Sequence, residues 1–499
     1  MKTKYKILLI AILFGLSYGC SDDFFDIKPP TLIEDEYYKD NDNVYMAVIG
    51  CYDILGWDSK HNSVPYFFAD IIGRDAYKGG DIGGDQPWMD GLIDFTYPKA
   101  NRVLNTEWKN NYIAINRCNK FLGNINKMTE TPKKQLDRYI AEVKFLRAYF
   151  HFELVKVFGE VPLVDHLLQP DEYVTKKASF SELYTFIEKD FQDAITSLPV
   201  RSDIENASEF GRVTKGAAQA MLAKVYLYQN KWQDAASLTD DIITSGEYEL
   251  LTNYEDLFKL EYEHNKEVVF EIEFKDQLNH WGNESNGNMF SVYMQARNHK
   301  VGNDAGWGFV CPTQEFVDEF EPSDIRKAAT IIYARDTLYK GTADQEIYNM
   351  TISGDHYASN FDKMLNKKFN LPKSQQPISG MDGPKNWIIC RYAQILLWNA
   401  EAKAHGAGDG DWQTPLNLVR TRAGLAATTE TDALKAVYHE QRVELGLEGQ
   451  RFWEVVRQGR GDDVFNSLNN PHINGTFIKG VNNYFPIPQT QLDLNDGEF

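Results

Sequence analysis

The chain has 499 residues, of which 43% are hydrophobic, a composition typical of a folded protein and not of a disordered one. Its 52 Lys and Arg residues against 72 Asp and Glu residues give a formal net charge of −20 at pH 7. An acidic surface of this kind argues against nucleic acid and anionic lipid surfaces as partners, and it suits neutral or cationic ligands.

The first residues have the features of a secretory signal peptide. Three lysines precede the apolar run Ile7–Leu16, which is too short to cross a bilayer. Gly19 then precedes Cys20, a pattern that looks like a bacterial lipobox, and we predict that Cys20 becomes the first residue and carries the lipid. Ordinary cleavage near Gly19 is the alternative. Removal of residues 1–19 takes away three Lys and no acid, so the charge changes from −20 to −23.

The folded part begins with two predicted helices separated by a long loop. Asp40–Trp57 carries apolar residues at helical spacing, and Thr106–Met128 does so again. Between them, Asn62–Pro98 is rich in Gly and Pro, and we predict no helix there. A loop of this length inside a compact protein is usually functional or disordered.

The next helix is the most apolar one and is predicted to form the core of the fold. It begins at Thr131-Pro132, with Thr as N-cap, and ends at Gly159. Apolar residues three or four apart line one face, and others line its flank, so the helix is expected to be buried between other helices. His151 lies among them and is predicted to be a core histidine. The apolar residues are Leu136, Ile140, Val143, Phe145, Leu146, Ala148, Phe150, Phe152, Leu154, Val155 and Val157.

The later helices come in pairs. Ser179–Glu182 is a capping box that opens a helix extending to about Leu198. Small and aromatic residues within Thr214–Ser245 stand in the order and spacing of a tetratricopeptide repeat. A looser pair is formed by Trp387–His405 and Trp412–Arg422.

The stretch between these pairs, roughly 246–385, has a different character. Val268–Phe274 alternates like a strand, and 277–308 holds aromatic residues among Gly and Asn. Asp432–Arg457 is predicted to be helical again, whereas Phe485–Pro488 contains two prolines and cannot be helix.

We therefore predict a mostly α protein with one folded domain behind a processed N-terminus. The predicted parts are a signal peptide at 1–19, a lipid-anchored acidic tether at 20–39, and a domain at 40–499 with a helical scaffold at about 40–245 and 386–457 and a loop-rich, partly β insert at about 246–385.

Six marks, in this order, resemble the SusD/RagB family of outer-membrane nutrient-binding lipoproteins. They are Cys20–Ile27, Trp108–Asn119, Phe145–Phe152 with Phe158–Leu163, Leu416–Gly424, Glu440–Arg451, and Phe485–Pro488. Each of these motifs alone is weak evidence for the family, but six motifs in the family's order behind a lipobox are specific to it. The resemblance covers nearly the whole chain.

The resemblance implies a mostly helical, SusD-like fold with four tetratricopeptide-like helix pairs as scaffold. It implies a lipoprotein of the outer membrane, exposed at the cell surface, that captures an oligosaccharide or polysaccharide and delivers it to a TonB-dependent, SusC-like transporter. We expect no enzymatic activity, no cofactor, no metal and no nucleic-acid partner.

In that family the ligand lies on aromatic residues of the early loop and the middle insert, here 62–98 and 277–308. Sugar rings stack their C–H faces on aromatic rings, while Asp, Asn and Arg bind the hydroxyls. For any single Trp, packing as a loop anchor explains the residue equally well or better, and we expect ligand contact from at least one of three. The predicted ligand-binding residues are Trp88, Trp281, Trp307, Tyr293, Asp70, Asp75, Asn283 and Arg297.

Other functions remain open at this point. A helix-repeat adaptor would bind the transporter or another protein, and a related alternative is the capture of a non-sugar nutrient. A surface glycosidase would need a carboxylate pair whose spacing a sequence does not display. The chain has no zinc-protease, P-loop or dinucleotide-binding motif, and its cysteines include no C-x-x-C pair. Four arginines on predicted helices, Arg420, Arg422, Arg442 and Arg451, are expected to pair with acids between stacked helices.

Overall fold

The computed structural model describes residues 34–57, 68–80, 85–204, 206–276, 287–297, 299–348, 364–467 and 475–495. The predicted signal peptide, Cys20, the tether up to residue 33, Trp281 and Asn283 lie outside these residues.

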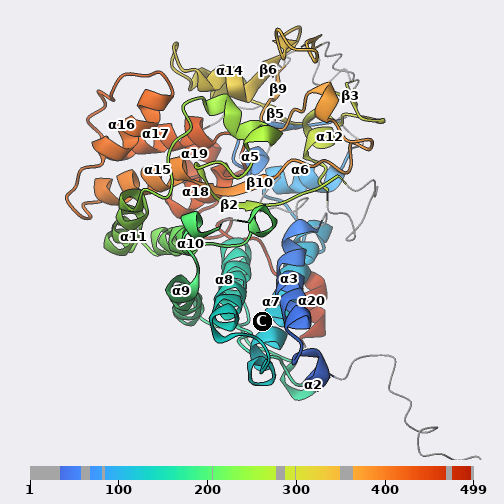
Figure 1. Cartoon of the computed structure of the whole chain (residues 1–499). Helices are drawn as coiled ribbons and strands as arrows, with labels where there is room; N and C mark the ends of the chain where they lie inside the picture. Colours follow the sequence, from blue (N-terminus) through green and yellow to red (C-terminus); the bar gives the residue numbers. More distant parts are fainter. Residues whose placement is uncertain are drawn as a thin grey trace, which may run out of the picture.

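A stack of helices forms the scaffold, and each of its members contacts the next. In this order they are α3 (Asn41–Tyr52), α7 (Arg102–Gly123), α8 (Lys133–Phe158), α9 (Phe180–Ser197), α10 (Lys215–Tyr228), α11 (Trp232–Ser245), α15 (Tyr392–Ala404), α16 (Gln413–Arg422) and α17 (Ala433–Leu445). The insert separates α11 from α15 in sequence, yet the two helices pack against each other, so the stack is continuous in space. Figure 1 shows α8 to α11 below and α15 to α17 at the upper left. The mostly α fold is confirmed.

The central helix α8 is the predicted core helix. From Ala141 to Phe158 every side chain except that of Lys144 is buried, His151 included. The helix ends at Gly159, whose φ of +76° is a conformation that favours glycine. The predicted N-cap was wrong by one residue: Pro132 is in the extended conformation and occupies the cap position, so Thr131 lies outside the helix. The capping box at Ser179 opens α9 as predicted.

The early loop, 62–98, contains short helices, so the prediction of no helix there was wrong. It contains α5 (Ala69–Ile72), β1 (Ala76–Gly79) and α6 (Pro87–Ile93). The glycines and prolines of this region mark the ends of short elements: Gly73 is the C-cap of α5, and Pro87 is the first residue of α6. The buried apolar residues of these three elements belong to the main core; they are Ala69, Ile71, Ile72, Ala76, Met89, Leu92 and Ile93.

Two further boundaries differ from the prediction. Val268–Ile272 is the predicted strand, β2, but it pairs antiparallel with β10 (Trp387–Arg391), so the helix predicted from Trp387 begins only at Tyr392. Asp432–Arg457 is not one helix, because residues 446–450 separate α17 from α18 (Arg451–Arg457).

The remaining elements are short. They are the helices α2 (Glu34–Tyr37), α12 (Phe290–Met294), α13 (Gln314–Asp318), α14 (Arg326–Thr330), α19 (Gly461–Asn466) and α20 (Gln489–Leu494), and the strands β3 (Lys300–Val301), β4 (Asp304–Ala305), β5 (Phe309–Pro312), β6 (Ile331–Tyr333), β7 (Thr337–Leu338), β8 (Glu346–Ile347) and β9 (Met364–Asn366). In the described residues the strands form two-stranded antiparallel pairs, β1–β5, β2–β10, β3–β4, β6–β9 and β7–β8.

A buried ionic network joins the insert to the scaffold. Glu444 of α17 accepts hydrogen bonds from Arg326 at 2.8 Å and from Arg391 and Arg422. Glu267 pairs with Arg391 at 2.9 Å and with Arg422 at 3.0 Å. Burial raises the pKa of Glu444, but the charges of the three arginines outweigh it and hold the pKa well below its usual range.

The arginines that the sequence singled out take part in such pairs, as predicted. Arg422 belongs to this network, and Arg420 pairs with Glu321 at 2.7 Å and Glu440 at 3.1 Å. Arg442 hydrogen-bonds Asp75 at 2.9 Å, and Arg451 lies 3.4 Å from the same carboxylate. Asp75 lies between α5 and β1, so these two arginines pair with the early loop and not with a stacked helix.

We predict that Glu444→Gln lowers the free energy of unfolding by about 3–5 kcal/mol, because it leaves three buried guanidinium groups without their shared counter-charge. Asp137→Asn is the control, since it breaks an exposed pair with Lys133 and should change stability by less than about 1 kcal/mol. Urea unfolding followed by circular dichroism measures both. Equal stability of the two variants would contradict the role of the network.

Candidate ligand-binding surface

Strand pairing brings the early loop to the insert. β1 and β5 run antiparallel with Gly79 opposite Phe309, and the amide of Gly80 donates to the carbonyl of Gly308 at 2.7 Å. Gly79 has φ +76°, and a Cβ there would lie 2.0 Å from the Gly308 oxygen, so only glycine permits this approach. The two regions expected to bind ligand therefore lie side by side.

An aromatic cluster of Tyr293, Trp307 and Phe309 forms beside this pairing. The rings of Tyr293 and Trp307 meet edge to face with centroids 4.8 Å apart, and Tyr293 lies 6.0 Å from Phe309. Tyr293 and Phe309 are buried, whereas Trp307 is only half-buried. A hydrogen bond of 2.7 Å from the Trp307 amide to the Val292 carbonyl holds the backbone at Trp307 beside α12. Trp307 is therefore the member of the cluster that offers ring surface to a ligand.

An ion pair lies next to the cluster. Arg297 pairs with Asp85, and each side chain is about one third exposed. Asp85 comes from the early loop and Arg297 from the insert, so the pair spans the two regions. Asp85 was absent from the sequence-based candidates, and its position directly after a Gly-rich run was the only signal for it.

Trp88 lies in a setting that fits a loop anchor. Its indole N–H donates to Gln86 at 2.6 Å, Phe68 meets the ring edge to face, and the Arg102 guanidinium lies over it at 5.0 Å. The half-buried ring thus holds α6 against the start of α7.

Asp70 and Asp75 lie in the interior and not on a ligand-accessible surface. Asp70 accepts hydrogen bonds from the amides of Gly449 at 2.6 Å and Arg451 at 3.5 Å. Asp75 pairs with Arg442 at 2.8 Å. Their exposed fractions are 2% and 0%, so neither carboxylate is accessible to a glycan, which corrects the expectation for these two residues. Both carboxylates instead hold the early loop to the segment from α17 to α18.

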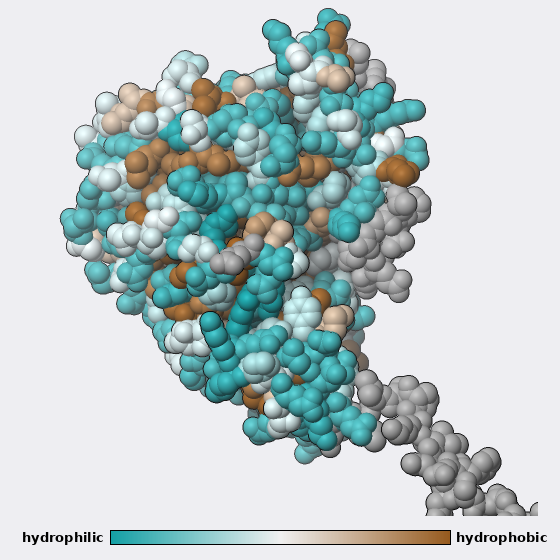
Figure 2. All heavy atoms as spheres, viewed as in Figure 1, coloured by the Kyte–Doolittle hydropathy of each residue, from teal (hydrophilic) through white to brown (hydrophobic). Residues whose placement is uncertain are grey.

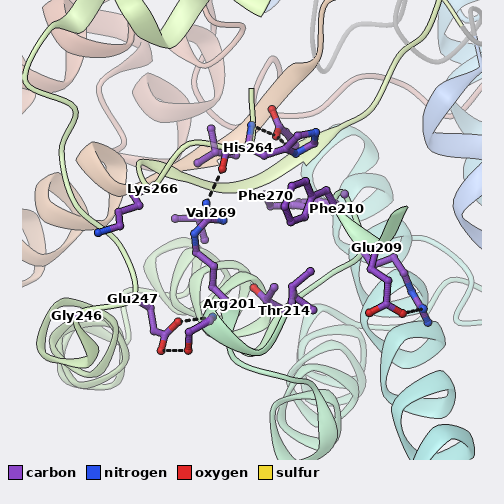
Figure 3. Close-up of a pocket in the computed structure, with 16 residues that line it drawn as sticks. Arg201, Glu209, Phe210, Thr214, Gly246, Glu247, His264, Lys266, Val269 and Phe270 are labelled. Carbon is purple, nitrogen blue, oxygen red and sulfur yellow. Dashed lines mark hydrogen bonds and ion pairs between the residues drawn. The ribbon is translucent and has the colours of Figure 1, made fainter. Parts of the chain in front are cut away.

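A pocket of about 420 Å³ is a second concave feature, and no sequence motif pointed to it. It lies between the turn before α10 and the segment that leads into β2 (Figure 3). Among the described residues, no group of three His, Cys, Asp or Glu side chains is placed to hold a metal ion. None of the helices described is both long and apolar enough to cross a bilayer.

The structure thus combines a stack of helices with a loop-built surface that carries a half-buried indole and an ion pair. Two family models match this chain: "SusD family" over residues 266–497 and "Starch-binding associating with outer membrane" over residues 88–227. The chain belongs to the SusD/RagB family.

Relatives resemble this chain over nearly its full length. "SusD-like protein P25" of Formosa agariphila is 25% identical, over 99% of this chain and 97% of its own. A "Laminarin binding SusD-like protein" has 28% identity and a TM-score of 0.78, with 92% of this chain and 98% of that chain covered. "Surface glycan-binding protein A from Bacteroides thetaiotaomicron in complex with laminarihexaose" has 25% identity and a TM-score of 0.79, with 92% and 98% covered.

We predict a pH-dependent contribution of Asp70 to stability. Burial, the largest cause, raises the pKa of Asp70 from 3.8 to about 7. At pH values between 3.8 and about 7, Asp70 keeps its proton in the native state but has lost it in the unfolded state. The free energy of unfolding therefore falls as the pH rises through this range.

Asp70→Asn keeps an oxygen acceptor for Gly449 but does not titrate. The loss of stability between pH 5 and pH 8, measured by urea unfolding, should be smaller in this variant than in the wild type. An equal loss in both proteins would show that Asp70 is ionised in the native state.

Proposed function

We propose that this protein is a non-catalytic lipoprotein of the cell surface that binds a glycan on the aromatic cluster and delivers it to a TonB-dependent, SusC-like transporter. The observation that carries the proposal is the half-buried indole of Trp307 beside the Arg297–Asp85 pair. A pyranose ring can stack on the indole while its hydroxyls bind the guanidinium and the carboxylate.

The comparisons support a glycan as the ligand class. One similar structure is titled as laminarin binding, and another is a complex with laminarihexaose. The acidic composition also fits a neutral glycan better than a polyanionic one.

Lipidation of Cys20 and a tether at 20–39 would hold the domain at the outer membrane, as the description of one matching family model suggests. The view in Figure 2 shows a largely hydrophilic face with separate hydrophobic strips, as suits a domain that is anchored from outside its fold. The helical scaffold is then available to the transporter while the loops carry the glycan.

The direct test is retardation of the soluble form, starting after Cys20, in native gels cast with neutral and acidic polysaccharides. One polysaccharide should retard the wild type, and Trp307→Ala should weaken that binding at least about tenfold, which equals about 1.4 kcal/mol. Trp281→Ala and Trp88→Ala are compared in the same gels.

Trp412→Ala is the matched control, because Trp412 is also half-buried but lies at the start of α16 in the scaffold. Retardation that persists in all three loop variants would overturn the proposed site. Absence of retardation by every polysaccharide would favour an adaptor or a non-sugar ligand.

The anchor is tested separately by Cys20→Ala in the full chain. Without the acyl chains the protein should leave the membrane fraction, because each buried CH₂ contributes about 0.8 kcal/mol to anchoring. Cell fractionation measures this, and protease treatment of intact cells reports surface exposure of the wild type. Membrane retention of the variant would contradict the lipid anchor.

A further inference from the structure

The pocket between α10 and β2 has the size of a small-molecule site. Its volume of about 420 Å³ lies within the range of 300–1,000 Å³ that ligand pockets occupy. Its lining comes from three parts of the chain (Figure 3). They are Arg201, Ser202 and Ile204 with 209–212 and Thr214, then Gly246 and Glu247, and then His264, Lys266 and 268–271. None of the residues of the aromatic cluster lines it.

An aromatic ring is exposed at this pocket. The side chain of Phe210 is 38% exposed, although such residues are commonly buried. The His264 ring lies 5.0 Å from it at an angle of 40° and supports it from one side. His264 is itself held by a 2.7 Å contact with Glu271. The ring of Phe210 is thus a fixed platform and not a mobile surface side chain.

Polar groups surround the platform. Arg201 donates from Nη2 to the carbonyls of His264 at 2.5 Å and Asn265 at 3.0 Å, which fixes its guanidinium. Within the part of the chain that the structure describes, Nε and Nη1 of Arg201 have no hydrogen-bond partner. Glu247 accepts from the amide and the hydroxyl of Ser202, both at 2.8 Å, and a carboxylate can accept further bonds. Donors and acceptors are therefore both available.

The charges at the pocket nearly balance. Arg201 and Glu247 both line the pocket and carry opposite charges, and His264 is paired with Glu271. Burial lowers the pKa of His264, but the hydrogen bond to Glu271 and nearby carboxylates outweigh it and raise the pKa. The Lys266 side chain points outward in Figure 3, toward Glu249. A neutral ligand rich in hydroxyls suits this balance better than a charged one.

We propose that this pocket is a second sugar site, which takes one or two units of a neutral pyranose. A ring face would stack on Phe210, with hydroxyls bound by the free N–H groups of Arg201 and by Glu247. The inference takes its ligand class from the proposed function, but it needs no contact with Trp307. Two sites on one chain would increase the avidity for a long glycan, because the second binding event is intramolecular.

The test is saturation-transfer NMR of the soluble protein with cellobiose, laminaribiose and maltose. We expect signals from at least one disaccharide in the wild type and in Phe210→Trp, which keeps a ring, and a loss of most of the signal in Phe210→Ala. Tyr262→Ala is the matched control, because Tyr262 is 39% exposed and does not line the pocket. Trp307→Ala should retain the disaccharide signals.

Three results would overturn the proposal. Loss of the signals in Trp307→Ala with no change in Phe210→Ala would place the disaccharide on the aromatic cluster. Signals with glucuronate and with none of the neutral sugars would make the pocket a carboxylate site. Absence of all disaccharide signals, together with polysaccharide retardation in gels, would leave the proposed function intact and exclude the second site.

Discussion

The convergence of three buried arginines on Glu444 is the interaction on which the arrangement of the molecule depends. Arg326 and Arg391 come from the insert and the strand that ends it, and Arg422 comes from the scaffold. Buried ions are stable only when all their partners are present, so the network favours one position of the insert on the scaffold over others. The neighbouring Asp75–Arg442 pair extends this control to β1, and β1 in turn positions β5 beside Trp307. The scaffold, the insert and the early loop are thus connected through charge pairs in the interior.

The helical stack and the insert have different roles in the fold. The stacked helices bury a continuous core, and α11 packs against α15 although some 140 residues of sequence lie between the helix pairs. The insert is therefore free to vary its exposed loops without interrupting the stack. The half-buried Trp307 and the Arg297–Asp85 pair lie where the insert meets the early loop, outside the helical stack, so substitutions there should cost the fold little.

Local sequence patterns were sufficient to predict the main helices of the scaffold. The periodicity of α8, the capping box of α9 and the alternation in β2 each depend on residues within a few positions of one another. The structural roles of Asp70 and Asp75 could not be predicted from the sequence, because their partners Gly449 and Arg442 lie far away along the chain. In a Gly-rich stretch an aspartate resembles an exposed loop residue, and only the fold reveals that it is buried. The Asp85–Arg297 pair and the Phe210 pocket likewise join residues that lie far apart in sequence, so no local pattern predicts them.

We propose that the early loop and the insert form one glycan-binding surface carried by the scaffold. Hydrogen exchange of the soluble protein, with and without the polysaccharide that retards it in gels, measures which segments the glycan protects. We expect slower exchange in peptides spanning residues 292–309 when the glycan is present, and no change in α8. Protection confined to the scaffold helices, with no change at residues 292–309, would contradict it.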